Sequence, residues 1–293
     1  MKLIFFGAGY CSKFILPRIG KEFTIICTHQ TNVKTEEFDK SLKIKRLTLS
    51  DFIKKKDFFL KDVTHIINSI PPFKNEDLVY NLIDSMGFRY LNKLKWFGYL
   101  SSTSVYGDHS GNWVDENTKT KPKTTRGKSR EKVENLYLSI FKKIGFPSHI
   151  FRLPGIYGPK RSTFEKLLSG NRFIIKKKSH YFSRIHVEDI ASAILVSMNR
   201  ITPGEIFNLT DNYPCSAEEV TKYAADLLKI YDMKFVDVNA PEINERIRDF
   251  YSDNKRVSNK KIKKILGWTP KFENYKLGLL GIYKKNQWQK YYK

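Results

Sequence analysis

The first residues whose types and spacing could do chemistry are two glycines near the start of the chain, in the run G-A-G-Y-C-S at residues 7–12. Gly7 permits a tight turn, and Gly9 has no Cβ, so the backbone there can approach a phosphate group. A helix that follows directly would direct its N–H groups at that phosphate. We therefore expect the pyrophosphate of a dinucleotide to be held by Gly7, Ala8, Gly9, Tyr10, Cys11 and Ser12.

The next chemical feature is the end of the second predicted strand, which reads C-T-H-Q at residues 27–30. Sites for NAD usually carry an acidic residue here that binds the ribose hydroxyls. No Asp or Glu occurs before Glu36. Thr28 and His29, together with Lys34, are suited to a 2′-phosphate instead. The sequence favours NADP over NAD and leaves both open.

These residues need a scaffold that brings strand ends together, and the sequence predicts one. Apolar runs and helical periodicity alternate, which is typical of βαβ units in a parallel sheet. Strands are expected at 2–7, 23–28, 43–47, 64–70, 96–101, 148–153, 182–186 and 207–210. Helices are expected at 10–19, 50–56 with Ser50 as N-cap, 75–86, 129–144, 187–198, 216–230 and 255–266.

This alternation predicts an α/β fold, a Rossmann-like doubly wound parallel sheet with a smaller C-terminal substrate-binding α/β subdomain. We assign residues 1–155 to an NAD(P)-binding Rossmann domain. Residues 156–293 are mainly assigned to substrate binding, with segments near 180–211 returning to the Rossmann core.

Composition narrows the class of protein. Of the 293 residues, 41% are hydrophobic, which is enough to bury a sizeable core. No apolar run is long enough for a membrane span or a secretory leader, so we expect a cytoplasmic location and no membrane. The three cysteines match no metal-ligand spacing and indicate reduced thiols and no metal.

The net charge of +23 is large, but its lysines are spread along the chain. No nucleic-acid motif accompanies them, so we expect no specific nucleic acid and a small, anionic substrate.

Five later segments are more specific than a general nucleotide-binding pattern. They are S-S-T-S-V-Y-G at 101–107, R-L-P-G-I-Y-G-P at 152–159, R-I-H-V-E-D-I-A at 184–191, G-E-I-F-N-L-T-D at 204–211, and N-K-K-I-K-K-I-L-G-W-T-P at 259–270. With the glycine run, in this order, they resemble the extended short-chain dehydrogenase/reductases of the NAD-dependent epimerase/dehydratase family. The resemblance covers nearly the whole chain.

The resemblance implies a role for each matched position. Ser102 or Thr103 would bind the reacting carbonyl, and counting back from Val105 favours Ser102. Tyr106 would lie at the substrate mouth, and His186 and Asp189 would hold the two domains together. The cofactor would be lined by Ser69, Ile70 and Pro71, and the nicotinamide would face Leu153, Pro154, Gly155 and Ile156.

One position departs from the family. Members that do chemistry use a Tyr and a Lys four residues later, so that both lie on one helix face. Residues 122–134 read P-K-T-T-R-G-K-S-R-E-K-V-E and keep the family's frame, but Arg126 stands at the Tyr position and Arg130 at the Lys position. Arginine stays protonated and polarises a carbonyl, but it is a poor proton shuttle. The chain in this respect resembles the atypical short-chain dehydrogenase/reductases.

Three functions stay open. The first is an oxidoreductase, epimerase or dehydratase acting on a sugar nucleotide or a related anionic carbonyl compound. The second is a non-catalytic NAD(P)-binding sensor or scaffold, and the third is a basic nucleic-acid-associated protein. Arg161 and Arg172 would suit a diphosphate, or would belong to a solvated basic face. A homodimer could form through the helices at 75–86 and 129–144, as the resemblance implies.

Overall fold

The computed structural model describes residues 1–30, 44–241 and 243–285. The chain divides into two compact units, and each is built from separate segments of the chain. The first unit comprises Met1–Ser102, Thr125–Arg152 and Ile190–Phe207, and the second comprises Thr103–Thr124, Leu153–Asp189 and Asn208–Lys293. The roles expected for residues 1–155 and 156–293 stay predictions.

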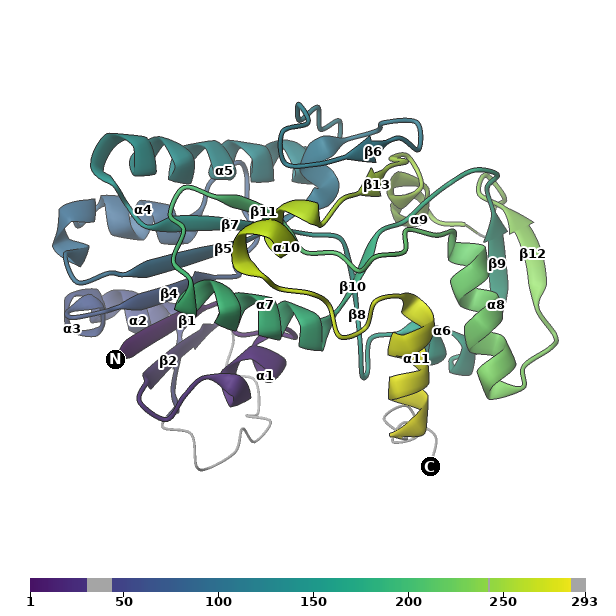
Figure 1. Cartoon of the computed structure of the whole chain (residues 1–293), viewed down its shortest axis with the longest axis horizontal. Coiled ribbons are helices and arrows are strands. Elements are labelled where there is room, and N and C mark those ends of the chain that lie inside the picture. Colours follow the sequence, from purple (N-terminus) through teal and green to yellow (C-terminus); the bar gives the residue numbers. More distant parts are fainter. Residues whose placement is uncertain (31–43, 242, 286–293) are drawn as a thin grey trace. The chain divides into compact units, whose positions relative to one another are not determined.

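A seven-stranded sheet forms the centre of the first unit, in the order β11-β7-β5-β4-β1-β2-β3 (Figure 1). The pairs β1–β2, β1–β4, β2–β3 and β4–β5 are parallel. This order confirms the expected doubly wound α/β fold. The strands are β1 (Lys2–Phe6), β2 (Thr24–His29), β3 (Ile44–Thr48), β4 (His65–Asn68), β5 (Trp96–Ser102), β7 (Ser148–Leu153) and β11 (Ile206–Asn208).

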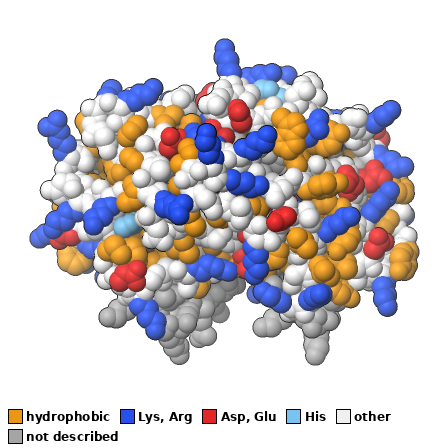
Figure 2. Space-filling view, in the orientation of Figure 1, with side chains coloured by type: hydrophobic (Ala, Val, Ile, Leu, Met, Phe, Trp, Pro, Cys, Tyr) orange, Lys and Arg blue, Asp and Glu red, His pale blue; other side chains and the backbone are white. Residues whose placement is uncertain are grey.

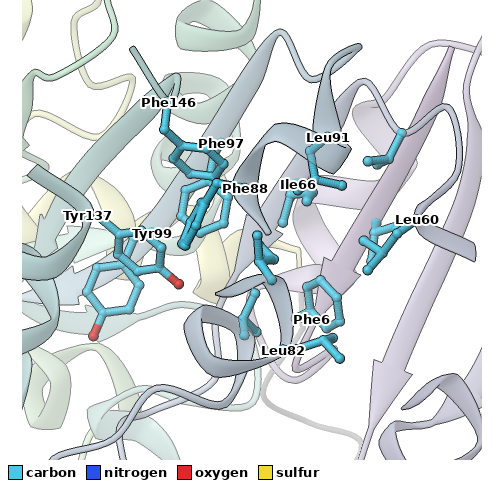
Figure 3. Packing of buried hydrophobic residues seen from close by; sticks show 14 of the residues in the cluster. Phe6, Leu60, Ile66, Leu82, Phe88, Leu91, Phe97, Tyr99, Tyr137 and Phe146 are labelled. Atoms are coloured by element: carbon cyan, nitrogen blue, oxygen red, sulfur yellow. The ribbon is translucent and has the colours of Figure 1, made fainter. Parts of the chain in front are cut away.

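Helices cover both faces of this sheet because neighbouring residues of a strand point to opposite sides. Phe97 and Tyr99 pack with residues of the helices α2–α5 in one apolar cluster, part of which is shown in Figure 3. Trp96 instead donates its indole N–H to Ser197 of α7, at 3.0 Å. The helical elements are α1 (Ser12–Ile15), η1 (Leu16–Arg18), α2 (Leu49–Lys54), α3 (Lys56–Leu60), α4 (Leu78–Asp84), η2 (Phe88–Leu91), α5 (Thr125–Ile144) and α7 (Val187–Asn199).

The second unit combines short strands with helices around three apolar clusters. Its strands pair two by two, as β8–β10, β9–β12 and β6–β13. The strands are β6 (Trp113–Val114), β8 (Gly155–Tyr157), β9 (Phe173–Lys176), β10 (Arg184–His186), β12 (Lys234–Asp237) and β13 (Arg256–Val257). The helices are η3 (Thr103–Tyr106), α6 (Thr163–Leu168), α8 (Ala217–Leu228), α9 (Glu245–Phe250), α10 (Lys260–Leu266) and α11 (Tyr275–Lys284).

Several expected boundaries were wrong for local reasons. The helix expected at 10–19 is only the four residues of α1 followed by a turn of 3-10 helix, which contains Pro17 near its start. Thr48, not Ser50, caps α2, because its side chain accepts the Asp51 N–H. α5 begins four residues earlier than expected, which places Arg126 on the helix.

The elements missed from the sequence are short ones, such as α3 and η2 of the first unit and α6 of the second. The missed α6 and the expected α8 each begin with a capping box in which a serine and a glutamate three residues later bond each other's backbone. No helix among the described residues is long and apolar enough to cross a membrane. On the face drawn in Figure 2, Lys and Arg side chains are scattered rather than gathered in one stripe.

The apolar cluster of the first unit should carry much of its stability. Phe97 is fully buried, with ring contacts to Tyr137 at 4.5 Å and Phe146 at 5.2 Å. We expect Phe97→Ala to lower the free energy of unfolding by about 3–5 kcal/mol, because it removes apolar contacts and leaves a cavity. Urea unfolding measures this. The matched control is Phe58→Ala, whose side chain is 70% exposed, and it should change the value by less than about 0.5 kcal/mol. Equal losses in the two variants would contradict this picture of the core.

Candidate functional site

The glycine run forms a turn that only glycine fits at its first position. Gly7 has φ of +79°, a region that L-residues with side chains rarely adopt. A Cβ at Gly7 would lie 2.9 Å from Ile70 Cγ1 and 3.1 Å from the Ile70 nitrogen. The structure therefore brings together two expected cofactor-binding segments, the glycine run and residues 69–71.

Gly9 differs from Gly7 because its missing Cβ leaves open space. The nearest protein atom to a Cβ at Gly9 would be the Gly7 oxygen, 3.8 Å away. The turn is stabilised by the Ser12 hydroxyl, which donates to the Gly9 carbonyl at 2.7 Å. An open backbone at this point fits the close approach of a pyrophosphate. The residues present thus fit a dinucleotide.

Thr28 holds the glycine run from the end of β2. The Ala8 N–H donates to the Thr28 carbonyl at 2.7 Å, and the Gly7 N–H donates to its hydroxyl at 3.2 Å. Thr28 is fully buried, and His29 beside it is half-buried. The roles of Thr28 and His29 toward a 2′-phosphate stay predictions, and Lys34 lies outside the described residues.

A buried polar network follows β4 and was missed by sequence reasoning. The Ser69 N–H donates to the Phe6 carbonyl at 3.0 Å, and the Ile70 N–H donates to Asn68 Oδ1 at 3.1 Å. The Asn68 amide in turn donates to the Asp77 carboxylate. The available signal was a polar residue at the end of an apolar strand, followed by an Asp at a helix start.

The carboxyl end of β5 is fixed by a buried ion pair. Ser101 Oγ donates to Glu134 Oε1 at 2.5 Å, and Arg152 Nη2 donates to Glu134 Oε2 at 2.7 Å. The side chains of Arg152 and Glu134 are 5% and 2% exposed. Ser102 is half-buried and Thr103 buried. Because strand side chains alternate, Ser102 points away from the side on which Ser101 meets Glu134.

Arg126 and Arg130, which stand where the family pattern has Tyr and Lys, lie one turn apart on α5. Arg130 Nη1 donates to the Leu100 carbonyl at 3.0 Å, so its guanidinium lies at the end of β5. Arg126 is exposed. The one tyrosine of α5, Tyr137, is fully buried and donates its O–H to Asp77. Burial raises the pKa of Tyr137 well above its ordinary value. No tyrosine of α5 can therefore replace the missing proton shuttle.

The expected nicotinamide-facing segment lies in the second unit. Leu153 is buried, while Pro154, Gly155 and Ile156 are half-buried. Gly155 and Ile156 belong to β8, which pairs in parallel with β10 through Gly155↔Arg184 and Ile156↔Ile185. Their role toward a nicotinamide stays a prediction.

The expected substrate residues are spread over the second unit. Tyr106 is fully buried and donates its O–H to Asn208 Oδ1 at 2.9 Å, so its hydroxyl is engaged in packing rather than open to a ligand. Arg161 is exposed. Arg172 forms an ion pair with Asp232. Their binding roles stay predictions.

His186 and Asp189 were expected to hold the two domains together, and this role stays a prediction; each also makes contacts inside the second unit. The Asp189 carboxylate accepts the Lys271 N–H at 2.8 Å and the Phe272 N–H at 3.0 Å. The His186 ring lies 4.0 Å from the Phe272 ring. Burial raises the pKa of Asp189 to about 6. These residues therefore fix the segment before α11.

Asp211, at the end of the motif at 204–211, is another buried carboxyl of this unit. It is 2% exposed, and its Oδ1 accepts the Tyr213 N–H at 3.1 Å. Burial raises its pKa to about 7, although the charge of Arg184 opposes the shift. The folded protein therefore keeps a proton on Asp211 over a range in which the unfolded chain has lost it.

The fold defines the class of this protein, a doubly wound α/β protein with a glycine turn at the end of its first strand. The sequence pattern of the NAD dependent epimerase/dehydratase family matches residues 73–210. The chain is 35% identical to a conserved protein of unknown function from Silicibacter pomeroyi, with a TM-score of 0.87 over 97% of this chain and 98% of that one. The chain thus resembles the NAD dependent epimerase/dehydratase family over a little less than half of its length.

More distant relatives share the fold. A dTDP-glucose 4,6-dehydratase from Bacillus anthracis, solved in complex with NAD, is 20% identical with a TM-score of 0.77 over 98% of both chains. The mouse dTDP-D-glucose 4,6-dehydratase is 28% identical over 188 residues, which are 60% of this chain and 51% of that protein. The chain spans about half the length of the curated dehydratases that it matches.

The two glycines of the turn should respond differently to alanine. Gly7→Ala should lower the free energy of unfolding by about 1–3 kcal/mol, because it combines an unfavourable φ with a close contact to Ile70. Gly9→Ala, the matched control, has room for its Cβ and should change the value by less than about 0.5 kcal/mol. Urea unfolding without added nucleotide measures both. A larger loss in Gly9→Ala would mean that the turn is built differently.

Asp211 should make stability depend on pH. Its folded pKa of about 7 is above the ordinary 3.8, so its stabilising contribution is complete below pH 3.8 and is lost as pH rises toward 7. Relative to Asp211→Asn, the wild type should lose about 2.5 kcal/mol of unfolding free energy between pH 5 and pH 8. Urea unfolding at the two pH values tests this. The exposed Asp226→Asn serves as control, and a wild-type curve parallel to that of Asp211→Asn would refute the assignment.

Proposed function

We propose that this chain binds NAD or NADP and acts with it on a sugar nucleotide or a related anionic carbonyl compound. The observation that carries the proposal is the turn at Gly7 and Gly9, where one Cβ position is blocked by Ile70 and the other is open. A turn of this kind serves a ligand that must touch the backbone. Relatives of the same fold include the NAD complexes of a dTDP-glucose dehydratase and of a UDP-glucuronic acid 4-epimerase from Bacillus cereus.

The expected site residues have distinct parts in this proposal. Residues 7–12 hold the pyrophosphate, residues 69–71 line the cofactor, and Arg130 takes the place of the lysine that holds the ribose. His29 carries the preference for NADP. A bound nicotinamide supplies or accepts a hydride. Ser102 or Thr103 donates a hydrogen bond to the reacting carbonyl.

Arg126 supplies electrophilic assistance rather than a proton in this scheme. A guanidinium stays charged, so it stabilises developing negative charge on a carbonyl oxygen without giving up its proton. Water then carries the proton, because Tyr106 and Tyr137 already donate their hydroxyls to Asn208 and Asp77.

The second candidate is a non-catalytic NAD(P)-binding sensor or scaffold. The observation that favours it is the exposure of Arg126 together with the commitment of Tyr137 to a buried network. This candidate needs cofactor binding and no turnover. Cytoplasmic location, and a homodimer formed through α4 and α5, remain predictions that fractionation and solution mass would test.

Calorimetric titration with NAD and with NADP tests the shared part of both candidates. The wild type should bind at least one of the two nucleotides, and it should bind NADP more tightly than NAD. Gly9→Ala should weaken binding by about tenfold or more, since its Cβ occupies the space needed by the pyrophosphate. Absence of heat with both nucleotides in the wild type would reject both candidates.

Variants of Arg126 separate the two candidates. With a substrate found by screening sugar nucleotides, Arg126→Ala should lower kcat by about 10²-fold or more, the scale on which electrostatic donors act. The control is Lys128→Ala, another exposed cation two residues away on α5, which should keep the wild-type rate. Equal rates in Arg126→Ala and wild type would remove Arg126 from the reaction. A wild type that binds cofactor and turns over no sugar nucleotide would favour the sensor.

A further inference from the structure

Three buried polar residues of the first unit form a hydrogen-bond network that supports the loop after β4. Asn68, Asp77 and Tyr137 are each at most 1% exposed. Asn68 Nδ2 donates to Asp77 Oδ2 at 2.8 Å and to Oδ1 at 3.1 Å, and Tyr137 O–H donates to Asp77 Oδ1 at 2.8 Å. Tyr137 brings this hydroxyl from α5, and its ring packs with Phe97 and Tyr99 in the apolar cluster (Figure 3). The network thus links β4, α4 and α5.

The carboxylate fixes which way the Asn68 amide faces. An asparagine has one donor end and one acceptor end. Because Asp77 and its oxygens occupy the donor end, the acceptor Oδ1 must face the opposite way, where it accepts the Ile70 N–H at 3.1 Å. Ile70 then lies against Gly7, at the distance that excludes a Cβ there. The orientation of one amide is therefore passed to the glycine turn through a single residue.

Stability does not explain this carboxylate well. Among the described residues no Lys, Arg or His pairs with Asp77, and burial raises its pKa above the ordinary value. A buried charge without a cation is costly, so such a group usually has a role in fixing one arrangement. Asp77 also caps α4 by accepting the Tyr80 N–H at 2.7 Å. A serine or threonine would cap the helix without burying a charge.

We propose that Asp77 and Tyr137 are positioning residues for dinucleotide binding, which orient Asn68 so that residues 69–71 are set against the glycine turn. The proposal rests on the proposed function, since it assigns these residues to the same cofactor site. The cofactor itself touches none of the three side chains in this scheme.

An exchange of the amide and the carboxylate tests the proposal. In Asp77→Asn the Tyr80 N–H and the Tyr137 hydroxyl hold the new amide by its oxygen, so its NH2 meets the Asn68 NH2, two donors without an acceptor. Asn68→Asp places two carboxylates within hydrogen-bond distance. Each should raise the Kd for NAD and for NADP by about tenfold, the effect of one lost hydrogen bond. In the variant that carries both substitutions, the amide now at position 77 can donate to the carboxylate now at position 68, whose other oxygen accepts the Ile70 N–H. The double variant should therefore recover most of the wild-type affinity.

A second pair of variants remains informative if the exchange variants fold poorly. Tyr137→Phe removes a donor to Asp77 and should weaken nucleotide binding severalfold. The matched control is Tyr80→Phe, because the Tyr80 ring lies 5.8 Å from that of Tyr137 and no hydrogen bond of its hydroxyl is found among the described residues. Tyr80→Phe should bind as the wild type does. Both variants are titrated at a temperature at which circular dichroism shows them folded.

Amide hydrogen exchange gives a readout without cofactor. The Ile70 amide should exchange at least tenfold faster in Asp77→Asn and Tyr137→Phe than in wild type or Tyr80→Phe. Unchanged affinity in the folded Asp77→Asn and Tyr137→Phe variants, with wild-type exchange at Ile70, would overturn the inference while the proposed function stands. Failure of the wild type to bind either nucleotide would instead reject the proposed function and this inference with it.

Discussion

The close approach of Gly7 to Ile70 is the constraint on which the candidate site of the first unit depends. It places the glycine turn, which ends β1, against the loop that ends β4, the neighbouring strand. Parallel strands end at the same edge of a sheet, so neither loop can move without displacing the other. Hydrogen bonds from Gly7 and Ala8 to Thr28 extend the same constraint to β2. Three adjacent strand ends thus form one rigid base for a ligand.

The end of β5 is held by a different kind of interaction. The buried pair of Glu134 and Arg152 ties α5 to β7, and Ser101 adds a hydroxyl to the same carboxylate. Such a pair gains little net stability because both charges must be taken out of water. Its effect is on geometry, since it fixes α5 in rotation and along its axis beside β5. The position of Arg130 at the Leu100 carbonyl follows from that placement.

Much of this arrangement could be predicted because it depends on local patterns. The short apolar runs and the glycine spacing predicted the sheet, its class and the turn at Gly7. Helix bounds were less accurate, because Thr48 and Asp77 act as caps through side-chain contacts that periodicity does not register. The network of Asn68, Asp77 and Tyr137 was not predictable, since its members lie up to 69 residues apart and meet only in the folded chain. The sequence signal for this network was a polar residue at the end of an apolar strand, followed by an Asp at a helix start.

The substitution of arginine at position 126 has a meaning that the surrounding structure sharpens. Polar contacts fix the helix that carries Arg126: Ser129 donates to Asn75 at 2.6 Å, and Glu134 pairs with Arg152. An exposed guanidinium on such a helix can bind an anionic group or polarise a carbonyl, and both uses need charge without proton release. In the proposed function Arg126 therefore supplies a fixed positive charge, and proton transfer must come from another group.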